Sequence, residues 1–151
     1  MEQAVKTARN GIDDGESPFG AVVARSDGHV IVAAHNSVRH DGDITAHAEI
    51  NAIRKACAAL GTIDLSGHVM ASTCEPCAMC AAAIHWARLD CLVYGASIGD
   101  ARSAGFRELD VPVEAILCRE PAQVRVFANV ARELCAQLFS EWQHGPNPEP
   151  Y

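Results

Sequence analysis

The chain has 151 residues, of which 49% are hydrophobic and 21% charged, a balance typical of one globular domain with its own core. Its formal net charge of −7, without any run of basic residues, disfavours a nucleic-acid partner. No apolar stretch approaches the roughly 20 residues that span a bilayer, and the N-terminus lacks a signal-peptide pattern. We therefore expect no membrane partner and a cytoplasmic location.

The first half of the chain predicts a helix, a hairpin and a second helix. Residues 2–14 are helical in pattern. Residues 19–24 and 30–35 read as two strands on either side of the turn signal Ser26-Asp27-Gly28. Residues 46–60 are rich in alanine, isoleucine and charged helix formers, so a second helix is expected there.

The second half of the chain alternates between strands and helices. Short apolar runs predict strands at residues 68–72, 89–94 and 113–117. A helix is expected over residues 76–88, because proline suits the first turn. Residues 122–142 predict a long amphipathic helix.

This order of elements predicts an α/β fold. Strands separated by helices need crossover connections, so helices should cover both faces of one sheet. The hairpin at 19–35 is antiparallel, so we expect a mixed five-stranded sheet. No repeat or linker divides the chain, and residues 1–143 should form one domain. Residues 144–151 hold three prolines and should form an extended tail.

Seven cysteines without a secretion signal argue against a disulfide framework. Cys57, Cys91, Cys118 and Cys135 lie in apolar or helical surroundings, where we expect small buried side chains with reduced thiols. Cys74 lies close to a C-x-x-C pair and is expected to pack rather than to bind a metal.

Two short segments carry metal-binding residue types, and each opens a predicted helix. Cys77 and Cys80 are three residues apart, so one helical face presents both thiolates, whose anionic form the helix N-terminus favours. His47, in the segment at 45–49, would supply a third ligand. Three protein ligands leave one tetrahedral position open, which is typical of a catalytic zinc ion, one per subunit. Such a site lowers the pKa of water toward about 7.

Glu49 follows His47 by two residues, a spacing that does not place both on one helical face. Both can border one pocket if that pocket lies off the helix N-terminus. Glu49 would then stand beside the metal without binding it, which suits a proton shuttle.

Two other interpretations of these residues remain open at this stage. A structural zinc site would need a fourth protein ligand, for which Cys74 or a further histidine is available. A redox pair would have no need for the His-x-Glu segment. The complete pattern therefore favours a catalytic zinc site over a zinc-stabilised binding module.

H-x-E followed by P-C-x-x-C is the signature of zinc deaminases that act on nucleobases. Over residues 10–106 the chain resembles the cytidine deaminase superfamily, and within it the bacterial guanine deaminases. The stretches that carry this resemblance are residues 18–22, 45–49, 52–57, 72–80, 83–88 and 104–106. It implies a three-layer α-β-α cytidine deaminase-like fold.

The resemblance also implies roles for residues outside the metal motif. Asn36 would hydrogen-bond a purine base, and Trp86 would shape the base pocket. Glu108 would bind the guanine edge and assist proton transfer. Tyr151 would cover the pocket of a partner subunit in a homodimer with exchanged tails. A strand-end turn for Asn36, core or dimer packing for Trp86, a solvated charge for Glu108 and disorder for Tyr151 are the structural alternatives.

The function that the resemblance implies is hydrolytic deamination of a free purine base, guanine to xanthine and ammonia. Phe19 and Trp86 would hold the flat ring, while main-chain groups around Ala48 read its polar edge. The alternatives are a nucleoside deaminase, acting on guanosine or cytidine, and a tRNA adenosine deaminase. Residues 103–114 are acidic rather than basic, which disfavours RNA.

Overall fold

The computed structural model describes residues 1–119 and 122–151. Its elements, in chain order, are α1 (Glu2–Asp13), β1 (Gly20–Arg25), β2 (Val30–His35), α2 (Val38–Asp41), α3 (Ala48–Leu60), β3 (His68–Cys74), α4 (Ala78–Trp86), β4 (Cys91–Ala96), α5 (Ile98–Ser103), α6 (Glu114–Leu117), β5 (Cys118–Arg119), β6 (Ala122–Gln123), β7 (Arg125–Phe127) and α7 (Arg132–Gln143). Within the described residues, no helix is long and apolar enough to cross a membrane.

The main sheet has five strands in the order β2-β1-β3-β4-β7. Strand β1 pairs antiparallel with both β2 and β3, whereas β3, β4 and β7 run parallel to one another. Helix α4 makes the crossover between β3 and β4, as parallel strands require. The predicted α/β class and mixed five-stranded sheet are confirmed.

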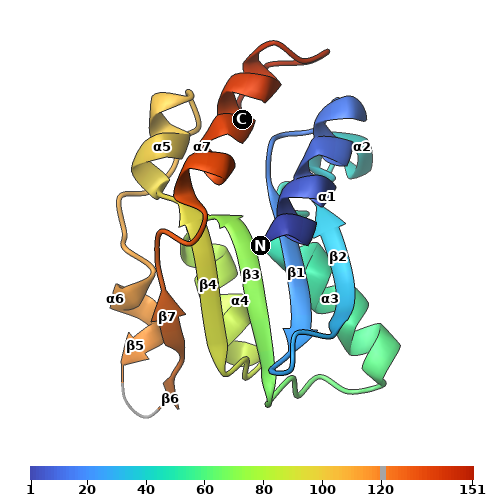
Figure 1. Cartoon of the computed structure of the whole chain (residues 1–151), viewed down its shortest axis with the longest axis vertical. Coiled ribbons are helices and arrows are strands. Elements are labelled where there is room, and N and C mark those ends of the chain that lie inside the picture. Colours follow the sequence, from blue (N-terminus) through green and yellow to red (C-terminus); the bar gives the residue numbers. More distant parts are fainter. Residues whose placement is uncertain (120–121) are drawn as a thin grey trace.

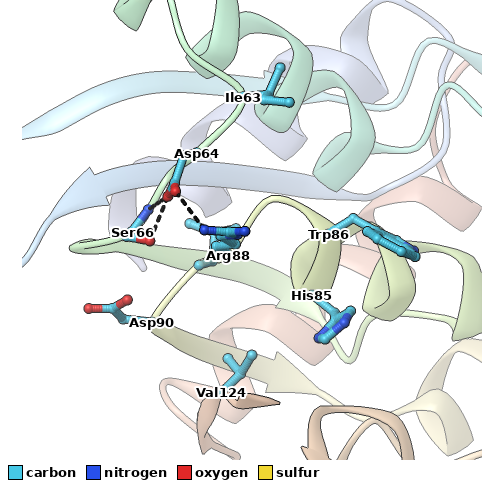
Figure 2. A pocket seen from close by; sticks show the side chains of 9 residues that line it. Ile63, Asp64, Ser66, His85, Trp86, Arg88, Asp90 and Val124 are labelled. Carbon is cyan, nitrogen blue, oxygen red and sulfur yellow. Dashed lines mark hydrogen bonds and ion pairs between the residues drawn. The ribbon is translucent and has the colours of Figure 1, made fainter. Parts of the chain in front are cut away.

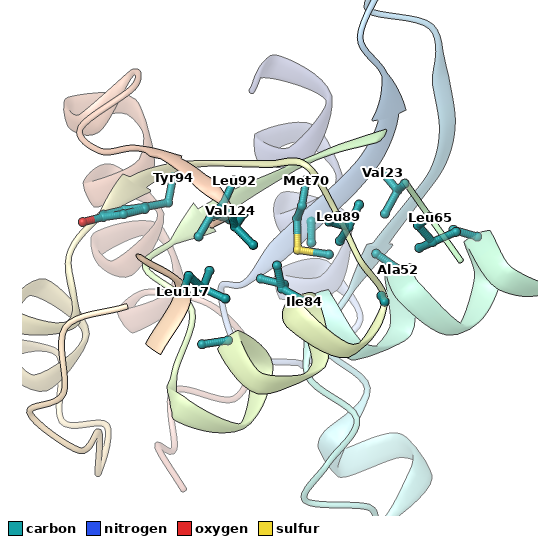
Figure 3. Close-up of a cluster of buried hydrophobic side chains, with 14 of the residues drawn as sticks. Val23, Ala52, Leu65, Met70, Ile84, Leu89, Leu92, Tyr94, Leu117 and Val124 are labelled. Atoms are coloured by element: carbon teal, nitrogen blue, oxygen red, sulfur yellow. The ribbon is translucent and has the colours of Figure 1, made fainter. Parts of the chain in front are cut away.

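Helices cover both faces of this sheet. Figure 1 shows α1 and α7 in front of the strands and α3 and α4 behind them. Two apolar clusters correspond to these two layers: one packs α3 and α4 against the sheet around Met70, Ile84 and Leu92 (Figure 3). The other joins α1 to α7 through side chains such as Ile12 and Leu138. The central strands β1, β3 and β4 are thus covered on both sides, as in other α/β layers.

The predicted strand at residues 113–117 is wrong, because Glu114–Leu117 form the short helix α6. Val113 and Leu117 are both fully buried. A spacing of four residues places them on one helical face, whereas an apolar run alone does not distinguish a strand from a helix.

The predicted helix over residues 122–142 is too long at its N-terminal end. Arg125–Phe127 form β7, which pairs with β4, and α7 begins only at Arg132. Asn129 and Ala131 have positive φ values of 60° and 54°, which interrupt a right-handed helix before that point. Residues that the amphipathic pattern assigned to the helix therefore form the edge strand β7 instead.

All seven cysteines are free, so the expectation that they form no disulfide framework is confirmed. Cys91 and Cys135 are buried and Cys57 is partly buried. Cys118 is exposed, which contradicts its expected burial. It lies where α6 gives way to the short strand β5, away from the main sheet.

Gly95 is expected to be intolerant of any side chain. A Cβ atom there would lie 2.3 Å from Cys135 Sγ of α7 and 3.1 Å from the Thr73 carbonyl oxygen. We predict that Gly95→Ala lowers the free energy of unfolding by about 1–3 kcal/mol, the usual cost of overpacking, in urea denaturation followed by circular dichroism. Gly99→Ala is the control, since its Cβ would meet only Ser97 Oγ at 3.4 Å. Equal stability of both variants would contradict the packing of α7 on β4.

Candidate active site and metal centre

Two helices begin side by side at the carboxyl end of β3, and each begins at a metal-binding residue type. His47 is the N-cap of α3 and Cys77 is the N-cap of α4. Both have an extended backbone, and neither side chain makes a capping hydrogen bond. Serine, threonine, aspartate or asparagine would normally occupy these positions and cap the helix. Here the imidazole and the thiol are instead free to turn toward each other.

The three predicted ligands form one cluster. His47 Nδ1 lies 3.7 Å from Cys77 Sγ and 3.6 Å from Cys80 Sγ. The three ligand atoms all lie within 4.8 Å of one another. A tetrahedral zinc ion with bonds of about 2.0 Å to nitrogen and 2.3 Å to sulfur separates those atoms by about 3.5 Å. The geometry of the cluster therefore fits zinc.

Cys74 takes no part in this cluster. It is buried, and its thiol donates a hydrogen bond to the Ser97 carbonyl oxygen at 3.5 Å. Among the described residues the cluster has three potential ligands and no fourth. That composition matches a catalytic zinc site and disfavours a structural one.

The two thiols differ strongly in acidity. Hydrogen bonding from Cys80, and then from His47, lowers the pKa of Cys77 to about 4. Its hydrogen bond to Cys77, and then burial, raise the pKa of Cys80 well above its usual value. One thiolate thus already forms at neutral pH, and a bound cation would favour the second.

Glu49 lies in the first turn of α3, beside the cluster but not within it. Only 6% of this residue is exposed. One carboxylate oxygen accepts a hydrogen bond from the Ser72 hydroxyl at 2.9 Å, and the other lies 3.4 Å from Cys80 Sγ. Burial raises the pKa of Glu49. A carboxylate with a raised pKa is suited both to accept a proton and to give it back. The sequence did not single out Ser72, because its contact with Glu49 crosses from β3 to α3.

A cavity of about 410 Å³ opens onto the cluster. His47, Cys77, Glu108 and Tyr151 line it together with the apolar side chains Ile44, Met79, Phe106 and Leu109. A small recess continues inward between Phe19, Glu49 and Glu108. The structure therefore gathers most of the predicted site residues around one opening.

Asn36 connects this cavity to the start of α3. It is completely buried, and its side-chain oxygen Oδ1 accepts the Ala48 backbone N–H at 2.9 Å. Its amide nitrogen donates to the Tyr151 hydroxyl at 2.5 Å. The N–H of Ala48 is thus already bonded to Asn36, so base recognition at Ala48 stays a prediction.

The C-terminal tail lies over the pocket of its own chain. The Tyr151 ring centroid is 5.9 Å from that of His47 and 5.7 Å from that of Phe106. Arg39 holds the tail by pairing with the Glu149 carboxylate at 3.6 Å and by donating to the Glu149 carbonyl oxygen. Exchange of this tail with a partner subunit stays a prediction.

Phe106 is a pocket residue to which the sequence assigned no role. It packs edge-on against Phe19, with ring centroids 4.9 Å apart, and tilted against Trp142 at the same centroid distance. Its neighbour Gly105 has a φ of 105°, a conformation that favours glycine. In the sequence, the glycine before Phe106 was the signal that could have drawn attention to this residue. Only the packing of the structure shows that the ring faces the pocket.

Trp86 does not line this pocket in the chain described here, so its role in shaping a base pocket stays a prediction. It is 79% exposed and lies in a separate hollow of about 700 Å³, near Ile63 and the Asp64–Arg88 ion pair (Figure 2). Six helical residues after Cys80 correspond to a rotation of about 240° and a rise of about 9 Å. The indole therefore points away from the metal cluster.

Glu108 lies at the pocket, on the loop that follows α5. Burial, and then the charge of Cys77, raise the pKa of Glu108 to about 7. Glu75 anchors the surrounding chain: its carboxylate accepts the Ile98 N–H at 3.1 Å and the Val113 N–H at 3.0 Å. Glu75 thus holds the start of α5 and the far end of the loop that carries Glu108.

Comparison with known proteins places the chain in a family. The family model of the cytidine and deoxycytidylate deaminase zinc-binding region matches residues 1–96. The chain belongs to this deaminase family. With the cluster of His47, Cys77 and Cys80, this confirms a zinc-dependent aminohydrolase.

Several relatives of this deaminase are known. The guanine deaminase of Bacillus subtilis (strain 168) is 43% identical over 154 residues, which cover 100% of this chain and 96% of that protein. The tRNA-specific adenosine deaminase of Agrobacterium fabrum is 46% identical over 114 residues, which cover 74% of each chain.

Solved structures give the same picture of this deaminase. A guanine deaminase from Nitrosomonas europaea matches with a TM-score of 0.83 and 30% identity, over 95% of this chain and 82% of that one. The X-ray structure of the Bacillus subtilis guanine deaminase matches with a TM-score of 0.67 and 38% identity, over 99% and 95% of the two chains. The predicted cytidine deaminase-like fold is confirmed.

Zinc content should depend on the three clustered residues and not on Cys74. We predict that His47→Ala and Cys80→Ala each abolish stoichiometric zinc, because two remaining ligands hold the ion weakly. Cys74→Ser should keep one zinc per chain, as measured by elemental analysis after dialysis. Loss of zinc from Cys74→Ser as well would indicate a fourth protein ligand.

Proposed function

We propose that this deaminase converts guanine and water to xanthine and ammonia. The observation that carries the proposal is the full-length likeness to a guanine deaminase, which includes the tail that closes the pocket. The tRNA-specific relative of Agrobacterium fabrum aligns with only 74% of the chain. The net charge of −7 also argues against an RNA substrate.

The residues of the pocket suit hydrolysis of an aminated ring. When bound by His47, Cys77 and Cys80, zinc supplies the Lewis acidity that lets water act as a nucleophile near neutral pH. Glu49 takes one proton from that water and delivers it to a ring nitrogen, and it then takes the remaining proton of the added hydroxyl group and delivers it to the leaving amine. A C–O bond forms and a C–N bond breaks at the same carbon, so ammonia leaves.

The shape of the pocket favours a small, flat base. The rings of Phe19 and Phe106 provide an apolar wall, and the buried Asn36 amide lies behind Tyr151, to whose hydroxyl it donates a hydrogen bond. That bond has to break before a base can accept a hydrogen bond from Asn36. With its pKa near 7, Glu108 can hold or release a proton close to the base. A ribose would meet the tail, which disfavours nucleosides.

Turnover should be specific for the base and should depend on Glu49. We predict ammonia release from guanine at least about 10-fold faster, in kcat/KM, than from guanosine, cytidine, cytosine or adenine. Glu49→Gln should keep one zinc and lose about 10³-fold or more in kcat, because the proton shuttle is gone. Rapid turnover of a nucleoside with inert guanine would overturn the substrate assignment alone. A zinc-stabilised binding module would show no turnover in either protein.

We propose further that this enzyme works as a cytoplasmic homodimer whose pocket is closed by the C-terminal tail. Trp86 and Ile63 are 79% and 83% exposed and lie around the same hollow, a surface that a second copy would cover (Figure 2). An exchanged tail could make the same contacts to Asn36 and Arg39 as the tail of the chain itself.

Removal of residues 144–151 should impair catalysis rather than folding. We predict that the truncated chain loses about 10-fold or more in kcat/KM for guanine, because the pocket stays open to water. Its zinc content should be unchanged, and an unaltered kcat/KM would contradict the proposed closure. Mixing the truncated chain with full-length Glu49→Gln then locates the tail: restored activity shows exchange between subunits, and no restoration shows closure within one chain.

A further inference from the structure

The carboxylate of Glu49 is held on one side by a residue outside the metal motif. Ser72 Oγ donates to Glu49 Oε1 at 2.9 Å, while Glu49 Oε2 lies 3.4 Å from Cys80 Sγ. The two oxygens therefore face different partners, one on the sheet and one at the metal cluster. Ser72 and Glu49 are only 1% and 6% exposed, so water does not compete freely for this bond.

Ser72 is fixed in place more firmly than a loop residue would be. It lies in β3, the central strand, where it pairs with Ala21 of β1 and with Tyr94 of β4. Neighbouring strands on both sides restrain its backbone. The hydroxyl thus gives Glu49 a rigid support, whereas Glu49 itself has three rotatable side-chain bonds.

A hydroxyl is out of place on this face of β3 unless it has a partner. Met70, two residues earlier and on the same face, is fully buried in the apolar cluster that contains Ala48 and Ala52 of α3. Burying a hydroxyl among such side chains costs free energy unless it is hydrogen-bonded. The bond to Glu49 supplies that partner.

We infer that Ser72 is a positioning residue, whose hydroxyl holds Glu49 Oε1 so that Oε2 faces the metal cluster. This inference rests on the proposed deamination, in which Glu49 carries protons between water and the base. A shuttle has to meet both within hydrogen-bonding reach, and misplacement by about 1 Å can cost about 100-fold in rate. Ser72 itself touches neither the base nor the metal.

The matched pair Ser72→Thr and Ser72→Val tests this role. Both variants add volume at the same place and have nearly the same shape, but only threonine keeps the hydroxyl. We expect Ser72→Thr to have a kcat within about threefold of the wild type. Ser72→Val should lose about 10- to 100-fold in kcat relative to Ser72→Thr, with KM within about twofold and one zinc per chain. Ser72→Ala, which adds no volume, should match Ser72→Val and replaces it if valine prevents folding.

A second comparison separates positioning from general packing. In a Glu49→Gln background the two Ser72 variants should have equal kcat, since the carboxylate that Ser72 holds is absent. Equal kcat in the wild-type background, or a loss confined to KM or zinc content, would overturn the inference. The rates are measured with whichever base the wild type turns over best. Inert guanine would therefore overturn the substrate assignment without affecting the conclusion on Ser72.

Discussion

The site depends on two helix N-termini that meet at one point. His47 and Cys77 occupy the N-cap positions of α3 and α4, so neither helix is capped by a side chain. The partial positive charge at both helix ends favours anions and would disfavour a lone cation. Two thiolates at this point reverse that preference. The positive ends of the two helices therefore explain why negatively charged cysteine ligands suit a cation at this position.

The same convergence produces the buried environment of Glu49. This residue lies in the first turn of α3, where it contacts Ser72 of the sheet and the metal cluster. Little of this residue is exposed to solvent, so electrostatic interactions and hydrogen bonds there are stronger than at the surface. The low exposure that raises the pKa of Glu49 also makes its orientation depend on a single neighbouring hydroxyl, that of Ser72.

Closure of the pocket comes from the opposite end of the chain. Tyr151 reaches Asn36, and Glu149 reaches Arg39, so contacts separated by more than 100 positions complete the wall. Packing of α7 against α1 and β4 brings the tail to this side of the sheet. The stability of the C-terminal layer and the shape of the pocket are therefore linked.

Short motifs and local patterns allowed the core of the site to be predicted. The spacing of Cys77 and Cys80 is a property of one helical turn, and the alternation of elements already implied helices on both faces of a mixed sheet. Local patterns failed at residues 113–117 and 122–131. There an apolar run and an amphipathic run were each compatible with two structures, and the edge of the sheet decided between them.

The sequence by itself determined the fold class and predicted the three clustered residues and Glu49 beside them, because the order of the elements sets the layers and the two short motifs place these residue types at the starts of two helices. Only the tertiary structure decided which way Trp86 points, that Glu75 anchors the Glu108 loop and that Ser72 holds Glu49. Those contacts join residues from different elements. Their partners are set by how helices pack on the sheet, and that packing leaves no periodic signal along the chain.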